Sequence, residues 1–364
     1  HDGHPDEETA PLRESVIEPL YGAFRALLKA RQRRGTLDLD LQERQPVFNE
    51  EGQVVGIEPR RRLDSHRLIE EFMILANVAA AEELEKRGQP CMYRVHDQPD
   101  KARVDALREV LEGLGLKLPK GQVPKPQTFT RILDQVKGTE AAPMVSELIL
   151  RAQAQAAYSP ENIGHFGLAL ARYAHFTAPI RRYADILVHR GLISGLKLGD
   201  DGLPAMDPES FQEIGVAISL TERRAAAAER DAIDRITAAF LEKHIGEVFA
   251  GRISGVTRFG LFITLEASGA DGLAPISTLP EDYYIHDERQ HCLIGRRTGR
   301  IFRLGQAITV ELLEAQPLTG GLILGIVETE EEKAKPLPKA SRRRSKEKAQ
   351  KGRSERTSPR RRGR

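Results

Sequence analysis

A change of residue pattern near Gly246 constrains the fold of this chain more than any other feature. Before this point apolar residues mostly recur at helical spacing, and after it they form short runs separated by glycine. Short runs bounded by glycine are typical of strands, and five in succession suit a small barrel of the OB type. The runs are VFAGRISGV, GLFITLE, GLAPIS, AITVELLEA and GLILGIVE. We therefore predict an α+β chain that contains a five-stranded OB-type β-barrel.

The part before the barrel is predicted to be mainly helical. Gly35 suits a helix stop, the tetrapeptide NEEG suits a hairpin turn, and the run TERRAAAAERDAIDR combines high helix propensity with many i,i+4 charge pairs. The second helix below is apolar on more than one face, so we expect it to be largely buried. The predicted helices cover residues 16–33, 65–87, 100–118, 127–155 and 208–243, with a hairpin within 36–58.

Charge is distributed unevenly along the chain. The segment Lys333–Arg364 holds 15 Lys or Arg and 2 acidic residues, a net +13, whereas the 364 residues together carry +2 and the remainder therefore −11. So few apolar residues cannot form a core, and we predict a disordered tail. A basic tail suits RNA or another polyanion, with an affinity that falls steeply with salt; a tail without function is the alternative.

Four parts follow from these patterns: a helical domain over 1–200, a connecting helix over 201–245, the barrel over 246–330 and the tail over 331–364. The start at His1 has no targeting character, and we interpret it as a cut through a longer protein. No apolar run is long enough to span a membrane. The two cysteines, Cys91 and Cys292, are far apart in sequence and fit a reducing compartment. We expect a cytoplasmic monomer.

The segment His165–Arg190 is the densest group of candidate functional residues. It contains two adjacent guanidinium groups, Arg181 and Arg182, after a Pro-Ile step. Arginine binds phosphate oxygens in a bidentate manner, and neighbouring hydroxyls and rings can hold sugar and base. The candidate RNA-contacting neighbours are Tyr173, His175 and Tyr183. The alternative is a solvated charge pair at the start of a helix.

A second group lies on the helix predicted over 65–87. At about 100° per residue, Glu70 and Asn77 fall within about 20° of each other and His66 about 40° from Glu70. A polar row on an apolar helix is costly unless it is paired or lines a wet pocket. Either Glu70 or Glu71 is a candidate site residue, and a structural hydrogen-bond network is the alternative. For the nearby element Tyr93–His96 we favour a structural role.

Both groups resemble motifs of the RNB-domain exoribonucleases of the ribonuclease R and ribonuclease II type. HFGLALARYAHFTAPIRRYADILVHR is similar to the family's long motif, with Ala178 where serine is usual, and HRLIEEFMILAN is similar to its helix motif. The resemblance implies 3′→5′ degradation of single-stranded RNA to 5′-mononucleotides. It also implies Mg²⁺ held by an aspartate cluster in the first half of the domain, upstream of His1. We therefore predict no metal ligand in this chain; Asp38 and Asp40 are a weak alternative.

The barrel resembles the S1 RNA-binding domain through GRISGVTRFGLFI and DGLAPIS. The resemblance implies that Phe259 and Phe262 stack on bases while Arg252 and Arg258 supply positive potential. Packing of both phenylalanines inside the barrel is the alternative. Pro275 replaces a histidine that many S1 domains carry, and three residues of the following predicted loop can compensate: Tyr283, Tyr284 and His286.

The leading hypothesis is therefore a partial RNB exoribonuclease domain followed by an S1 barrel and a basic tail. Its candidate catalytic residues are Arg181, Arg182, Glu70 and Glu71. The resemblance implies that Arg181 holds the phosphate next to the scissile bond, while Arg182 supports it or packs structurally. A non-catalytic module that binds single-stranded RNA through the barrel and tail is the second hypothesis. A translation-associated adaptor is third, because it leaves the arginine pair unexplained.

Overall fold

The structure is a computed structural model that describes residues 6–39, 43–121, 123–139, 141–288 and 291–327. It divides into two compact units. The first contains the described residues up to Lys243 with the short segments 268–270 and 315–321, and the second contains most of the remainder from His244 onward. The predicted disorder of the basic tail lies outside the described residues.

The first helix of unit 1 confirms the sequence prediction, and the hairpin confirms it except for its first strand, which the alternating residues from Thr36 had suggested. A π-helical turn, Arg13–Ile17, leads into α1, Glu18–Arg34, which ends where Gly35 adopts φ 79°. β1, Arg44–Phe48, pairs antiparallel with β2, Val54–Pro59. Residues 36–39 form no strand, because the amide of Leu37 donates instead to the carbonyl of Gly167 at 2.8 Å.

Helix α2, Asp64–Lys86, lies next to α1 and α6, Tyr183–Leu196. The prediction that α2 is largely buried was wrong for one face, since Ile69 is 57% exposed and Leu75 51% exposed. The opposite face packs into a core with the short antiparallel pair β3, Tyr93–Val95, and β4, Ala157–Ser159. The residues of this core include Ala81, Leu84, Tyr93, Val95 and Val188.

Three shorter helices form a second core. They are α3, Lys101–Gly113, α4, Pro126–Val136, and α5, Ala142–Ala152. Residues 127–155 therefore do not form one helix: α4 ends at Val136, and Gly138 then adopts φ 77°. The buried side chains between these helices include Leu107, Leu111, Phe129, Ile132 and Ile149.

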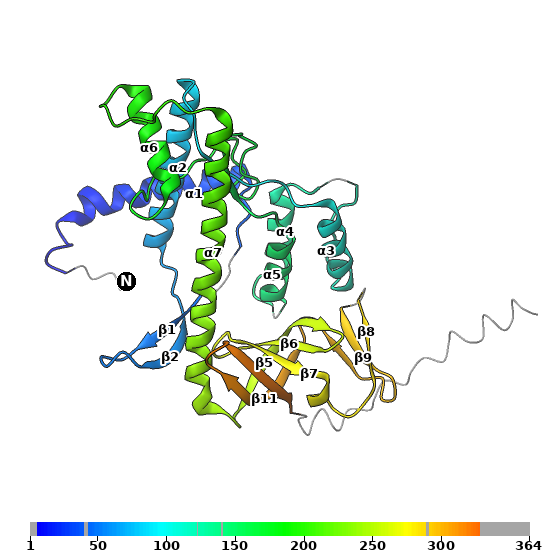
Figure 1. Ribbon diagram of the computed structural model, residues 1–364. Coiled ribbons are helices and arrows are strands. Elements are labelled where there is room, and N and C mark those ends of the chain that lie inside the picture. The colour runs from blue at the N-terminus through cyan, green and yellow to red at the C-terminus, as the bar shows by residue number, and fades with distance from the viewer. Residues whose placement is uncertain (1–5, 40–42, 122, 140, 289–290, 328–364) are drawn as a thin grey trace, which may run out of the picture. The chain divides into compact units, whose positions relative to one another are not determined.

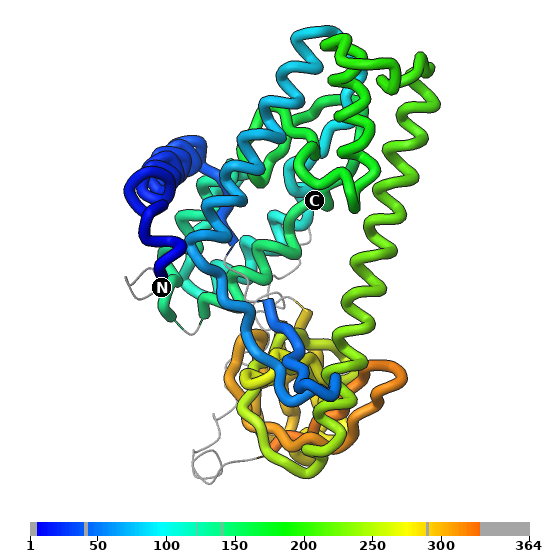
Figure 2. The backbone as a smooth tube through the Cα atoms, turned by 90° about the vertical axis from the view of Figure 1, so that its left-hand side faces the viewer, coloured from blue at the N-terminus to red at the C-terminus, as the bar shows by residue number. Residues whose placement is uncertain are grey.

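Helix α7, Pro208–Leu241, is a single helix of 34 residues (Figures 1 and 2). Its N-terminus is capped by Asp207, whose side chain accepts a hydrogen bond from the amide of Ser210. The helix contacts β4, the hairpin β1–β2 and α6. The buried hydroxyl of Ser219 accepts a 2.8 Å hydrogen bond from the amide of Tyr158, which fixes β4 against the helix. The helix is thus an integral part of unit 1.

Unit 2 confirms the five-stranded barrel. Its closed strand order is β11-β12-β7-β6-β5. The strands are β5 Val248–Thr257, β6 Gly260–Leu265, β7 Asp271–Pro275, β11 Ala307–Gln316 and β12 Gly321–Ile326. Alternating buried residues such as Ile253, Ile263 and Val310 fill the barrel, as the period of two requires.

A separate three-stranded sheet was not predicted from the sequence. Its strands, in the order β10-β9-β8, are β8 Tyr284–Asp287, β9 Cys292–Gly295 and β10 Ile301–Arg303. Across the part of the chain that the structure describes, no helix has the length and apolar character needed to cross a membrane.

Candidate nucleic-acid interface

The two adjacent arginines lie in different environments. The carboxylate of Asp185, which has no exposed surface, accepts hydrogen bonds from the amide of Ala178 and from Nη2 of Arg182, both at 2.7 Å. These contacts hold the turn that precedes α6, and they engage the largely buried Arg182. Arg181 is exposed, beside Ile180, which is 98% exposed. The geometry thus leaves Arg181 available to a ligand and gives Arg182 a structural contact.

The rings of His165, Tyr173 and His175, which we call the ring row, lie beside this turn. The rings of Tyr173 and His175 meet edge to face at 5.6 Å, and those of His165 and Tyr173 at 5.3 Å. His175 Nδ1 shares a 2.8 Å hydrogen bond with the hydroxyl of Tyr158. Tyr183, the first residue of α6, is 51% exposed. The row therefore offers rings and hydroxyls next to an exposed guanidinium.

Both histidines of this row are held neutral. Burial, assisted by the positive charges of Arg182, Arg94 and Arg181, lowers the pKa of His175 to about 3. Burial also lowers the pKa of His165 to about 3, assisted by His96 and Arg94. At neutral pH these rings can exchange hydrogen bonds but cannot serve as cationic phosphate ligands.

Arg94 and two residues that the sequence did not single out, Tyr158 and Glu222, contact these rings or one another beside them. Arg94 donates to the carboxylate of Glu222 at 2.6 Å, and its guanidinium lies 4.6 Å from the ring centre of Tyr158. Arg94 belongs to the YRVH element, where the structural role that we favoured fits His96: its ring accepts from the amide of Gly167 and contacts the carbonyl of Ala154. Tyr158 and Glu222 lie in no motif that would have revealed them.

Asn77 connects helix α2 to the ring row. Its Nδ2 donates to the Tyr173 hydroxyl at 3.0 Å, its Oδ1 accepts from the amide of Phe176 at 2.9 Å, and the residue is 2% exposed. The side-chain amide is thus engaged by protein groups, as the structural alternative for this helix anticipated. His66 is exposed at the start of α2, where its Nδ1 accepts from the amide of Leu63 at 3.1 Å.

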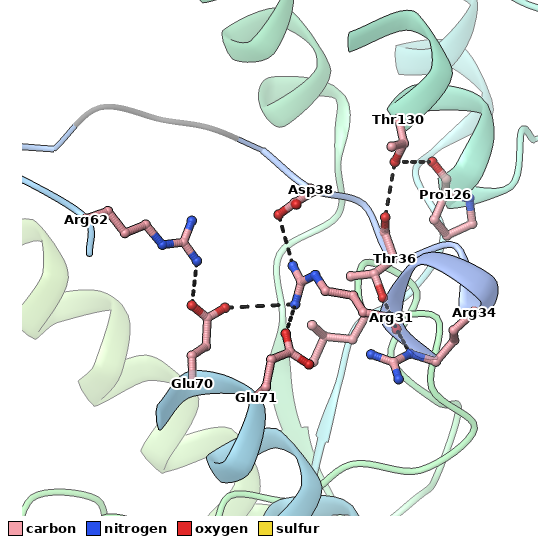
Figure 3. A network of polar contacts seen from close by, with 10 residues as sticks. Arg31, Arg34, Thr36, Asp38, Arg62, Glu70, Glu71, Pro126 and Thr130 are labelled. Carbon is pink, nitrogen blue, oxygen red and sulfur yellow. Dashed lines mark hydrogen bonds and ion pairs between the residues drawn. The ribbon is translucent and has the colours of Figure 1, made fainter. Parts of the chain in front are cut away.

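The two glutamates of α2 meet a pair of arginines (Figure 3). Arg31 of α1, with 11% of its side chain exposed, donates to Glu71 at 2.8 Å and lies 3.9 Å from Glu70. Arg62 pairs with the other oxygen of Glu70 at 2.5 Å. Glu71 is buried and Glu70 is half-buried. Both carboxylates are therefore paired with guanidinium groups, and of the two only Glu70 is open to solvent.

Glu70 and the ring row belong to one electrostatic neighbourhood. Burial raises the pKa of Tyr173, and the negative charge of Glu70 adds to that effect. The motif residues of α2 and those around Tyr173 are about a hundred positions apart in sequence, and the fold brings them together. No sequence signal identified Arg31, which lies in a basic stretch of α1.

No metal site is formed by the residues that can be described. Asp38 is bound by Arg31 at 3.0 Å, so its carboxylate is already paired with a cation. Asp40 lies outside the described residues. Within the described ranges, no group of three or more His, Cys, Asp or Glu side chains could hold a metal ion. The donor set of these residues therefore does not fit Mg²⁺.

The barrel presents two aromatic rings on its surface. Phe259 is 53% exposed and Phe262 38% exposed, and their rings meet edge to face at 6.1 Å. Phe262 packs over Gly255, where a Cβ would approach its side chain to 3.2 Å. This exposure is more than residues filling the barrel would keep, and it suits stacking on bases.

The two arginines near these rings, Arg252 and Arg258, differ in their contacts with other protein groups. Arg258 is exposed. Arg252 donates to the carbonyl of Gly305 at 2.9 Å and pairs with Glu266 at 3.3 Å, so it is partly engaged within the barrel.

The loop assignment after the third barrel strand was wrong in part. Tyr284 and His286 belong to β8, and Tyr284 is buried with its hydroxyl donating to the carbonyl of Pro280 at 2.8 Å. Tyr283 precedes the strand and is 69% exposed. Of the two tyrosines, only Tyr283 therefore presents its ring to solvent.

Comparison with known proteins gives the same two parts. The RNB domain family matches residues 2–197, more than half of the chain, and the S1 RNA binding domain family matches residues 242–326. Ribonuclease R of Aquifex aeolicus (strain VF5) is 44% identical over 303 residues, covering 83% of this chain and 42% of the relative. Ribonuclease R of Escherichia coli (strain K12) is 40% identical over 314 residues, covering 84% and 38% respectively. The chain thus spans well under half the length of these relatives.

Solved structures support the same assignment. Mycoplasma genitalium RNase R in complex with ribose methylated single-stranded RNA matches with a TM-score of 0.79 at 30% identity, covering 86% of this chain and 50% of that chain. The apo form of the same enzyme gives a TM-score of 0.78 at 29% identity, with the same coverage. The chain therefore belongs to the RNB-domain family and carries an S1 RNA-binding domain after its RNB domain.

Proposed function

We propose that this chain is the 3′-end-holding and strand-binding part of a ribonuclease R-type 3′→5′ exoribonuclease, which degrades single-stranded RNA to 5′-mononucleotides. The observation that carries the proposal is the exposed guanidinium of Arg181 on a turn fixed by the buried Asp185, next to the ring row. A rigidly presented guanidinium can hold a phosphate in one geometry, which is what stabilisation of a phosphoryl transition state requires. The relatives named ribonuclease R support the assignment.

The proposed roles follow the distribution of charge and exposure. Arg181 holds the phosphate next to the scissile bond, and Arg182 keeps the turn in place through Asp185. Glu70 is the better candidate for accepting a hydrogen bond from a ribose hydroxyl, because it is half-buried. Glu71 is buried and pairs with Arg31. Tyr173 and His175 pack against each other and line the site beside Arg181. Tyr183 offers an exposed ring for stacking.

The proposal includes a divalent metal that other residues must hold. RNB nucleases generally depend on a divalent metal ion, and we propose Mg²⁺ for this one. The described residues do not provide its ligands. We accordingly propose that this chain supplies only part of a complete RNB domain.

The remaining expectations belong to the same proposal. We propose that the basic segment Lys333–Arg364 is disordered and contacts phosphates without reading sequence. We propose a reducing cytoplasmic compartment on the two buried free thiols, Cys91 and Cys292. We also propose that the protein is a monomer. A protein that only binds RNA would use the exposed Phe259 and Phe262. This alternative does not explain why Arg181 is exposed on a fixed turn, so we favour the nuclease.

A matched pair of variants in the complete enzyme tests the role of Arg181. Arg181→Lys should lower turnover on single-stranded RNA roughly a hundredfold, since a lost transition-state donor costs about 3 kcal/mol. RNA binding should weaken less, and the melting temperature should stay the same because Arg181 is exposed. Arg182→Lys should instead lower the melting temperature, because it weakens the contact with a fully buried carboxylate. Unchanged turnover of Arg181→Lys would rule out the assignment.

A further inference from the structure

A cleft in unit 1 lies at one edge of the sheet β3–β4 and contains none of the residues assigned above. Its volume is about 930 Å³, and its lining includes Asp97, Lys101, Arg103, Gln153 and Gln155. The antiparallel pairing of Val95 with Ala157 brings the end of β3 and the segment before β4 to the same edge. Helix α3 starts a few residues after β3, and α5 ends a few residues before β4, so four elements converge there.

Gln153, one of the lining residues, carries a buried acceptor without a hydrogen-bond partner among the described residues. The residue is 7% exposed, and its Nε2 donates to the carbonyl of Ile149 at 2.9 Å. Its Oε1 is buried and finds no hydrogen-bond partner among the residues that the structure describes. Leaving a buried acceptor unpaired is costly. Because the bond from Nε2 fixes the orientation of the amide, Oε1 is held in one position within a residue that lines the cleft, and it still needs a donor.

The charged residues of the cleft are engaged to different extents. Asp100 caps α3 by accepting from the amides of Ala102 and Arg103, and Asp97 accepts from the amide of Gln98 at 2.7 Å. Arg103 is exposed and uses one of its donors, at 3.3 Å, on the carbonyl of Gln153. Lys101 is exposed at the first position of α3. The acidic groups thus accept hydrogen bonds from the local backbone, while the two cations are exposed and line the cleft.

A pair of exposed cations and a buried, oriented acceptor that line the same cleft fit a ligand with a phosphate at one end and a hydrogen-bond donor at the other. We propose that the cleft binds a single nucleotide. Lys101 and Arg103 hold its phosphate, and a base amino group or ribose hydroxyl donates to Gln153 Oε1. The cleft volume lies within the range of small-molecule sites. A free mononucleotide and one residue of an RNA strand present the same chemistry.

The cleft is joined to the ring row through His96. The Nε2 of His96 contacts the carbonyl of Ala154 at 2.8 Å, and its ring lies 5.0 Å from that of His165, which packs on Tyr173. The segment that would bind the nucleotide is therefore in direct contact with the candidate site. The choice of RNA nucleotides as the ligand class rests on the proposed function. Binding of a nucleotide requires no hydrolysis, so it can be measured independently of nuclease activity.

Titration of the purified chain with AMP in EDTA, followed by NMR, tests the site without catalysis. We expect the side-chain amide signal of Gln153 and the backbone amides of residues 101–103 to shift and saturate. Lys101→Glu should weaken AMP binding about tenfold; glutamate is favourable at the start of a helix, so folding is preserved. Lys117→Glu makes the same charge change at an exposed lysine that does not line the cleft, and it should leave binding unchanged.

A second variant and two other probes complete the test. Gln153→Met removes the acceptor at similar side-chain volume and should weaken AMP binding about tenfold. If Gln153→Met unfolds, the affinity of Lys101→Glu alone tests the site. Shifts with a short oligoribonucleotide but not with AMP would support the site and identify a strand residue as its occupant. Equal shifts with inorganic phosphate alone, no shifts with any probe, or equal binding by both lysine variants would overturn the proposal. These binding measurements do not depend on hydrolysis, so a failure of the proposed nuclease function would leave their outcome unchanged.

Discussion

At the scale of single residues, Asp185 decides how the arginine pair is presented. The sequence identified Arg181 and Arg182 together, because a guanidinium pair after Pro-Ile is visible in the chain. The family resemblance suggested that Arg181 holds a phosphate and that Arg182 supports it or packs structurally. It did not reveal Asp185 as the residue that separates the two roles, because this carboxylate becomes buried only on folding. Asp185 takes Arg182 as its partner and leaves Arg181 exposed. The catalytic role of Arg181 stays a prediction.

Other residues of the candidate site were beyond sequence reasoning for the same kind of reason. Arg31 meets Glu71 across 40 positions, and Arg94 meets Glu222 across 128 positions. Neither pair has a local spacing that marks it, because helix and strand periods relate only near neighbours. Asn77 was found because it shares a helix with Glu70, yet its partners Tyr173 and Phe176 come from another segment.

The neutral histidines make the stability of unit 1 depend on pH. Burial lowers the pKa of His175 from 6.5 to about 3, so the folded state binds its proton far less readily than the unfolded chain. The stabilisation is complete above pH 6.5 and is lost progressively as the pH falls towards 3. His175→Gln should therefore reduce the slope of unfolding free energy against pH between 6.5 and 4 by about one proton, or about 1.4 kcal/mol per pH unit.

Urea unfolding monitored by circular dichroism at a series of pH values measures this slope. Tyr158→Phe is the control, because it removes the hydrogen bond to His175 but leaves the titrating ring in place. It should lower stability at every pH with nearly the same slope. His165 remains in both variants and titrates over the same range, so some slope should persist. An unaltered slope in His175→Gln would contradict the prediction.

At the scale of elements, the sequence identified the barrel well and the helical region less completely. The five predicted runs correspond to β5, β6, β7, β11 and β12, because each alternates apolar residues and is bounded by glycine. Strands β8 to β10 were missed because they are only three or four residues long and lie among charged residues. Helices α4 and α5 were not separated, because the break around Gly138 depends on backbone conformation.

The exposed rings of the barrel should contribute to RNA affinity without supporting the fold. Replacing Phe259 and Phe262 by alanine should cost about 1–3 kcal/mol per base unstacked, while the barrel stays folded because both rings are well exposed. Fluorescence anisotropy with single-stranded RNA measures the affinity, and circular dichroism checks the fold. Val248→Ala, at the other end of β5 and 56% exposed, should leave the affinity unchanged. Equal affinities of the double variant and the wild type would mean that the rings have only a structural role.

At the scale of the whole molecule, the sequence separates an acidic body from a basic end. The net +13 of Lys333–Arg364 balances a remainder of −11, so positive charge for a polyanion is concentrated where few apolar residues occur. The family matches divide the same chain into an RNB domain over 2–197 and an S1 domain over 242–326. The strand binding and the phosphate chemistry that we propose therefore belong to different parts of the chain, and an experiment can observe RNA binding without hydrolysis.

We expect the purified chain to bind single-stranded RNA and to release no mononucleotides from it. Binding follows from the exposed Phe259 and Phe262 and from the basic end of the chain. Hydrolysis should be missing because the described residues contain no metal-holding group of three ligands, and Asp38 is already paired with Arg31. Phosphodiester cleavage without a metal loses its main source of charge stabilisation.

Incubation with Mg²⁺ and RNA that has an accessible 3′ end, followed by chromatography of the products, tests this expectation, and a gel shift with the same RNA confirms binding. Ribonuclease R of Escherichia coli, treated in parallel, shows that the assay detects mononucleotides. Metal-dependent release at a comparable rate would contradict the prediction. It would require a carboxylate cluster that includes residues outside the described ranges, and Asp38→Asn and Asp40→Asn would then be the first variants to separate a metal ligand from the ion pair with Arg31.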